Sequence, residues 1–360
     1  MKKKIALLLT AVLMLSVLSG CAGTTVVYDG CTCPTGVPEA GTTIAPVESV
    51  VSEGAVKTGL YVGTTIADST SADAENEGQA KFDITLVAVT VNDAGVIESC
   101  VIDSVPATVN FDAAGVITSD ITAAVSTKNE LGESYGMKAY GGAQYEWNEQ
   151  AAALADYAVG KTVEELKNGA INESGKAKDA DLASTATIYL GGYVSGIETA
   201  VNNAQHLGAQ SGDKLVLATL NGVAGSVSAD GETAGTAQLD STITALTLSG
   251  DVITSCYIDA VQAKVSFDAT GTITTDLTAP VQTKNELGES YGMKAYGGAI
   301  AEWNEQAAAF AAYVTGKTAE EVAGIAVNEK TAPADGTDLA SSVTISIGGF
   351  QALIAKAAAQ

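Results

Sequence analysis

Hydrophobic and polar residues alternate from 82 to 90, as expected for a strand with one buried face. The inward series is Phe82, Ile84, Leu86, Ala88 and Thr90. Asn-Asp-Ala-Gly at 92–95 predicts a turn, after which residues 96–101 return as the second strand of a hairpin. A further short hairpin is predicted around residues 111–118. Strands therefore come first in this part of the chain.

Helical periodicity follows the strands. From about 144 to 159, apolar residues recur on one helical face, and Gly160 is placed to end the helix. That face consists of Trp147, Ala151, Leu154, Ala155 and Ala158. Thr162 and Glu165 have the spacing of a capping box that opens a second short helix. Residues 186–189 predict a last strand that ends at Gly191-Gly192. This order predicts a small α+β domain, an antiparallel sheet with one or two helices.

The whole pattern occurs twice. Residues 127–143 recur unchanged at 283–299, an offset of 156, and one inserted residue raises the offset to 157 before Asp338. So long a period exceeds a solenoid repeat and predicts a tandem domain duplication. We expect copy one at 55–200, a connection at 201–211 and copy two at 212–355.

Residues 1–20 have the pattern of an export signal. Lysines at positions 2–4 precede an apolar stretch at 5–18 that is too short to span a membrane comfortably. Leu-Ser-Gly-Cys at 18–21 resembles the bacterial lipobox, which implies that Cys21 is lipidated and becomes the mature N-terminus. An ordinary signal peptide followed by an incidental cysteine is the alternative. Residues 21–54 are rich in Thr, Val, Gly and Pro and predict a flexible tether. The expected location is the extracytoplasmic side of a bacterial cell membrane, with the lipid as anchor.

Charge and composition exclude several functions. The formal charge is −24, there is no Arg, and removal of the signal with its three lysines takes the charge to −27. So acidic a chain is a poor partner for nucleic acid. His206 is the single histidine, which argues against His-rich metal sites and a His-based triad. We therefore predict no metal site, and no catalytic acid–base pair stands out.

The cysteines other than Cys21 fall into two pairs. Cys31 and Cys33 lie in the tether and are read as exposed thiols. Cys100 and Cys256 occupy matching strand positions and are expected to be small buried side chains, with a disulfide between the copies as the alternative.

A seven-residue segment near the end of each copy carries candidate chemistry. Residues 181–187 read Asp-Leu-Ala-Ser-Thr-Ala-Thr, and residues 338–344 read Asp-Leu-Ala-Ser-Ser-Val-Thr. Both resemble the flavinylation signal of the FMN-binding domain family, approximately D-x-x-S/T-G-A-T, whose last Thr binds FMN covalently through its phosphate. The family glycine is replaced in both copies, and Val343 replaces the family alanine in copy two, so copy one is the closer match.

The resemblance implies specific roles for these residues. Thr187 and Thr344 would be joined to FMN by a phosphoester, giving one or two FMN per chain. The positions read by the flavin transferase would be Asp181, Ser184, Asp338 and Ser341. In the repeated block, candidates to stack or pack on the isoalloxazine ring are Tyr135, Met137, Tyr291 and Met293. Packing of these four side chains into the core is the alternative.

Lipobox, tether and repeat together resemble the two-domain flavinylated lipoproteins of bacterial extracellular electron transfer. The resemblance implies a carrier that receives electrons from a membrane quinol-linked donor and passes them to an extracellular acceptor, such as ferric iron or a soluble mediator. A non-redox surface lipoprotein that binds a ligand or partner through two degenerate domains is the main alternative. A surface enzyme that uses FMN to reduce one substrate is another.

Overall fold

The computed structural model describes residues 54–360. The predicted export signal, Cys21, Cys31, Cys33 and residues 21–53 of the predicted tether lie outside the described residues. Within residues 54–360, no helix combines the length and the hydropathy needed to cross a membrane.

Each copy begins with a three-stranded antiparallel sheet in sequential order. The strands of copy one are β1 (Lys57–Thr65), β2 (Gly78–Val91) and β3 (Ile97–Phe111). Its helices are α1 (Lys128–Leu131), the 3₁₀ helix η1 (Gly132–Tyr135), α2 (Trp147–Ala158), α3 (Val163–Ala170), α4 (Ala180–Thr185) and α5 (Gly191–Asn202). The strands of copy two are β4 (Lys214–Gly222), β5 (Gly235–Ser249) and β6 (Val252–Phe267). Its helices are α6 (Lys284–Leu287), η2 (Gly288–Tyr291), α7 (Met293–Gly297), α8 (Trp303–Val314), α9 (Ala319–Ala323), η3 (Leu339–Ser341) and α10 (Gly348–Ala358). The α+β prediction is confirmed at this level.

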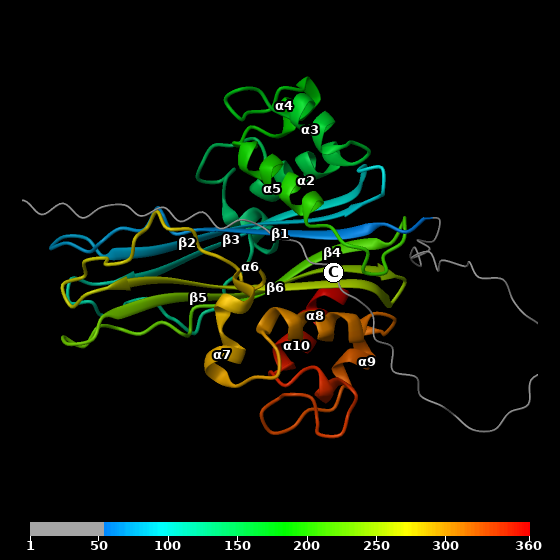
Figure 1. Ribbon diagram of the computed structural model, residues 1–360. Helices are drawn as coiled ribbons and strands as arrows, with labels where there is room; N and C mark the ends of the chain where they lie inside the picture. Colours follow the sequence, from blue (N-terminus) through cyan, green and yellow to red (C-terminus); the bar gives the residue numbers. More distant parts are fainter. Residues whose placement is uncertain (1–53) are drawn as a thin grey trace, which may run out of the picture. The chain divides into compact units, whose positions relative to one another are not determined.

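The two sheets face each other and share one core. Figure 1 shows them as adjacent layers, with the helices of each copy on the outer face of its own sheet. A single cluster of buried residues draws on all six strands. Within this cluster, at the ends of β3 and β6, the rings of Phe111 and Phe267 stack in parallel, with centroids 4.0 Å apart and planes 2° apart. Because these two residues are equivalent in the repeat, their contact lies on a pseudo-two-fold axis.

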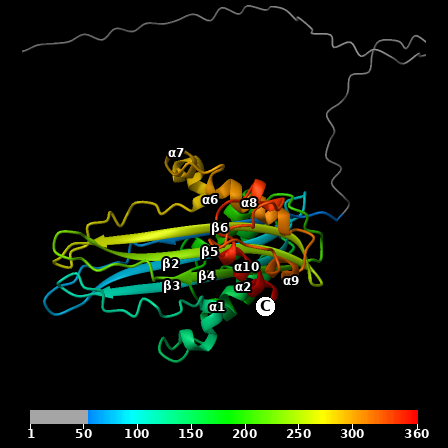
Figure 2. The same cartoon turned by 90° about the horizontal axis from the view of Figure 1, so that it is seen from below.

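Reciprocal hydrogen bonds follow the same pseudo-symmetry. The amide of Ala72 donates to the carbonyl of Gly271 at 2.8 Å, and the equivalent Ala229 donates to Gly115 at 2.8 Å. Figure 2 shows the strands of both sheets running along the same direction, with the α6–α7 segment on one side and α1 on the other. Residues 201–211 also belong to the folded unit, since Thr58 and Gln205 exchange both main-chain hydrogen bonds at 2.9 and 3.0 Å.

The strand predicted at 82–90 is present but is buried more completely than its alternation suggests. Leu86 and Ala88 face the other sheet, whereas Val87 and Val89 pack under α2 and α5. The second half of β2 is therefore covered on both faces. The turn at 92–95 and the bridge between Phe111 and Ile117 confirm the two predicted hairpins.

The two helices predicted from neighbouring residues, α2 and α3, are confirmed. All five residues of the predicted α2 face are buried. Thr162 and Glu165 form the expected capping box at the start of α3. Cys100 and Cys256 are free thiols with no disulfide between them. Cys256 is buried as predicted, whereas Cys100 is only partly buried. Removal from water raises the pKa of each thiol to about 12.

The strand predicted at 186–189 is wrong. The segment is irregular, and Gly191-Gly192, expected to end a strand, instead begins α5. The amides of Thr187 and Ile188 donate to the side chain of Gln150 and so make no strand ladder. A segment of only four residues has no period that distinguishes a strand from an irregular segment leading into a helix.

Candidate functional site

Thr187 is exposed and held by one buried side chain. The Gln150 Oε1 atom accepts from the Thr187 amide at 2.8 Å, the Ile188 amide at 3.1 Å and the Thr187 hydroxyl at 3.2 Å. The hydroxyl makes the longest of the three contacts and belongs to an exposed residue. It can therefore react while the two main-chain bonds keep the segment in place.

Copy two repeats this arrangement. Gln306 Oε1 accepts from the Thr344 amide at 2.8 Å, the Ile345 amide at 3.2 Å and the Thr344 hydroxyl at 3.2 Å. Thr344 is likewise exposed. The geometry is kept although Ser342 and Val343 differ from their counterparts in copy one.

The fold fixes each glutamine before it meets the threonine. Gln150 and Gln306 lie on the buried face of α2 and α8, and both are 0% exposed. Their Nε2 atoms donate to the carbonyls of Tyr145 at 3.0 Å and Ala301 at 2.8 Å. An amide whose nitrogen is bonded in this way presents its oxygen in one direction. We call this arrangement the glutamine latch: Gln150 with Thr187 and Ile188, and Gln306 with Thr344 and Ile345.

A buried glutamate positions the predicted methionine. Glu146 is 2% exposed, and its carboxylate accepts from the amides of Met137 at 2.8 Å and Lys138 at 3.1 Å. The Met137 sulfur lies 4.0 Å from Gln150 Nε2, so Met137 borders the latch. In copy two, Glu302 holds Met293 in the same way at 2.8 Å.

The predicted tyrosines lie beside a lysine enclosed by aromatic rings. Lys128 Nζ is 5.3 Å from the Tyr135 ring centroid and 5.2 Å from that of Trp147, distances at which a cation is attracted to a ring face. The same atom is 3.4 Å from an Asp83 carboxylate oxygen. In copy two, Lys284 repeats both ring contacts, at 4.9 Å from Tyr291 and 5.0 Å from Trp303. Both tyrosines are thus only partly buried against the core, beside a cation.

The structure does not bring the predicted recognition residues against the threonines. Asp181 and Ser184 are exposed on α4, where the Ser184 hydroxyl donates to the Asp181 carbonyl at 2.7 Å. Asp338 and Ser341 are exposed with the same 2.7 Å contact. Their carboxylates and hydroxyls are accessible to another protein, and their role in recognition stays a prediction.

The surroundings of Thr187 suit a phosphoester. Helix α5 begins four residues later with Gly191-Gly192; no side chain caps its N-terminus, although the Gly191 amide donates to the Gly175 carbonyl at 3.2 Å. The N-terminus of a helix attracts anions through its free amides and its dipole. Lys176 Nζ donates to the Thr187 carbonyl at 2.9 Å, which brings a cation to the main chain of the same residue. In copy two α10 begins with Gly348-Gly349 and is also uncapped by a side chain. The residues present therefore fit a threonine-linked phosphate better in copy one than in copy two.

Sequence reasoning missed the residues that hold this site. The predicted site includes neither Gln150 nor Glu146. A signal was present, because Gln150 stands three residues after Trp147 on an otherwise apolar helix face, and it recurs unchanged as Gln306. A glutamine kept on a buried face needs partners for both ends of its amide.

Comparison with known proteins provides no relative for this chain. No protein-family model, no curated protein and no solved structure matches it. Within residues 54–360, no three His, Cys, Asp or Glu side chains gather in a way that could hold a metal ion.

Proposed function

We propose that this protein is a lipid-anchored, extracytoplasmic electron carrier with FMN esterified to Thr187 and Thr344. A flavin transferase transfers the FMN from FAD: the threonine oxygen bonds to the FMN phosphorus, the pyrophosphate bond of FAD breaks, and AMP and the hydroxyl proton leave. A membrane quinol-linked partner donates electrons, and ferric iron or a soluble mediator accepts them. The observation that carries the proposal is the glutamine latch, which presents an exposed threonine hydroxyl at the same place in both copies.

The two latches support a modification site better than a packing role. A threonine that served only the core would be buried, whereas both threonines are exposed and only their glutamine partners are buried. Because the latch bonds the main chain on both sides of the threonine carbonyl, the attachment point does not depend on the hydroxyl that would be consumed.

The chain's own residues have distinct tasks in this proposal. Bound FMN supplies the redox chemistry through its isoalloxazine ring, and the protein supplies position and polarity. Thr187 provides the ester oxygen, and Lys176 with the uncapped start of α5 offsets the phosphate charge in copy one. Met137 supplies apolar surface next to the latch, and Tyr135 supplies an aromatic ring beside the Lys128 cation.

Site-resolved mass spectrometry tests the proposal. The full chain is co-expressed with a flavin transferase whose activity is verified on a known acceptor protein, and peptides containing Thr187 and Thr344 are then analysed. We expect FMN on both threonines, with fuller occupancy at Thr187. Gln150→Ala should lower occupancy at Thr187 and leave Thr344 unchanged, so copy two serves as the internal control. Modification at other residues, or none at all, would refute the proposal and favour a non-redox binding protein.

A further inference from the structure

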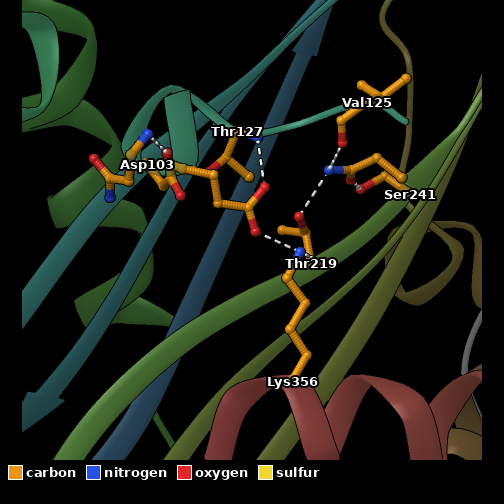
Figure 3. A network of polar contacts seen from close by, with 9 residues as sticks. Asp103, Val125, Thr127, Thr219, Ser241 and Lys356 are labelled. Carbon is orange, nitrogen blue, oxygen red and sulfur yellow. Dashed lines mark hydrogen bonds and ion pairs between the residues drawn. The ribbon is translucent and has the colours of Figure 1, made fainter. Parts of the chain in front are cut away.

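A lysine ammonium occupies a site at one junction between the two copies. Lys356, on α10 of copy two, forms an ion pair with the Glu130 carboxylate of copy one, and its Nζ donates to the Thr219 carbonyl at 2.7 Å. Figure 3 shows the Lys356 side chain reaching up beside Thr219 and toward the segment that contains Thr127. The other carboxylate oxygen of Glu130 accepts from the Thr127 amide at 2.9 Å. The ammonium therefore sits between a carboxylate of one copy and the free edge of a strand in the other.

A cavity of about 320 Å³ surrounds this contact. Copy one lines it with Val101, Asp103, Thr127, Asn129 and Glu130. Copy two lines it with Leu217, Ala218, Thr219, Lys356, Ala359 and Gln360.

The pseudo-two-fold axis generates a second cavity from the equivalent residues. This cavity, of about 400 Å³, is what we call the second junction cavity. Copy two lines it with Tyr257, Asp259, Thr283, Asn285 and Glu286. Copy one lines it with Leu60, Tyr61, Val62, Asn202 and Asn203, joined by Ala204 and Gln205. Each residue that lines the first cavity, Lys356 excepted, has its repeat equivalent in the second.

The cation is the one component that the second junction cavity lacks. The position of Lys356 is taken in copy one by Thr199, whose hydroxyl donates within its own helix to Ser195 at 3.0 Å. Glu286 keeps the conformation of Glu130, since one of its carboxylate oxygens accepts from the Thr283 amide at 2.8 Å. No described residue forms an ion pair with Glu286. The pKa of Tyr61 is raised, mainly by the burial of Tyr61 itself and secondly by the negative charge of Glu286.

The carbonyl that completes the site is also available. Val62 takes the place of Thr219 on the edge strand β1. Thr58 and Thr64 use the outer edge of this strand to pair with Gln205 and Val281. Val62 is separated from Thr58 and from Thr64 by an even number of residues. Because main-chain groups alternate in direction along a strand, the N–H and C=O of Val62 face the same outer edge as those of Thr58 and Thr64.

We infer that the second junction cavity binds a small primary ammonium compound, with its nitrogen where the repeat places the ammonium of Lys356. The Glu286 carboxylate and the Val62 carbonyl accept hydrogen bonds from the nitrogen. Tyr61, in place of Ala218, adds an aromatic ring beside the cation. Asn202 and Asn203, in place of Ala359 and Gln360, provide amides for a polar tail. The inference does not depend on flavin, since neither latch contributes to this cavity.

Calorimetric titration of the full chain, expressed without a flavin transferase, tests the inference. The probe is n-butylammonium chloride, whose cation reproduces the lysine side chain. Tetramethylammonium chloride at equal ionic strength controls for general attraction to the acidic protein, because its cation has no N–H to donate. We expect saturable binding of one n-butylammonium per chain and none of tetramethylammonium.

Matched variants locate the site. Glu286→Gln should weaken binding by about 10- to 100-fold, the loss expected for a hydrogen bond to a charged group. Glu130→Gln makes the same change in the cavity that Lys356 already fills, and it should leave binding unchanged. Thr199→Lys should place an internal ammonium in the site, abolish binding and raise the melting temperature. Equal binding of the two cations, unchanged binding in Glu286→Gln, or no saturable binding by the wild type would overturn the inference.

Discussion

Replacing Gln150 by leucine removes the latch of copy one while keeping side-chain volume nearly constant. The substitution deletes the contacts from the Thr187 amide, the Ile188 amide and the Thr187 hydroxyl, and the contact to the Tyr145 carbonyl. A net loss of about 1 kcal/mol is typical of each well-formed hydrogen bond. The hydroxyl contact is long and lies at an exposed residue, so water can replace it. Since added apolar burial offsets part of the remainder, we expect a loss of about 2 kcal/mol in the free energy of unfolding.

Urea denaturation and amide exchange measure this effect. Gln144→Leu is the matched control, because Gln144 is exposed and its side chain contacts only the neighbouring Tyr145 hydroxyl at 3.4 Å. We expect little change in the control, and faster exchange at the Thr187 and Ile188 amides in Gln150→Leu alone. A change below about 0.5 kcal/mol, within the range of ordinary surface substitutions, together with unchanged exchange would refute the latch as a structural element.

Two further predictions concern the core and its acids. Phe111→Ala should lower the free energy of unfolding by about 3–5 kcal/mol and destabilise both copies in one calorimetric transition. In a double-mutant cycle, its coupling to Phe267→Ala should be about 0.5–1.5 kcal/mol. Two separate transitions, with only one shifted, would contradict the shared core. Burial raises the pKa of Asp103 and of Asp259 to about 6. Between about pH 4 and 6, the folded state therefore keeps protons that the unfolded state releases. The free energy of unfolding should fall as the pH rises through this range. Asn at both positions should flatten that slope in urea denaturation, and an unaltered slope would show that other groups set it.

Much of each copy follows from local sequence signals. The 92–95 turn, the apolar face of α2 and the Thr162 capping box depend on residues close together in the chain, and all three were predicted. The strand expected at 186–189 was wrong because a four-residue segment is too short to show a period of its own. The path of this segment depends on Gln150, 37 residues earlier in the chain, which accepts a hydrogen bond from the Thr187 amide.

The repeat alone does not predict whether the two copies fold separately or share one core. A duplication is compatible with two separate domains or with two halves of one core. The choice depends on the inner faces of the sheets, where equivalent residues such as Phe111 and Phe267 meet. The alternation in β2 indicated one buried face, and the burial of Val87 and Val89 came from helices packed later in the chain. Long-range packing decides such burial.

The candidate site was also predicted only in part. Thr187 and Thr344 came from a sequence resemblance, and the structure places both at exposed, equivalent positions. The residues that hold them are buried polar side chains, which a hydropathy pattern records only as interruptions. Their partners are main-chain groups, whose positions are known only from the fold.

On our proposal, Thr187 and Thr344 each accept FMN. The decisive measurement is the intact mass of the full chain co-expressed with an active flavin transferase. We predict two FMN additions to the wild type, one to Thr187→Val, one to Thr344→Val and none to the double variant. An unmodified wild type, or a double variant that still gains FMN, would show that these threonines are not the flavin attachment sites.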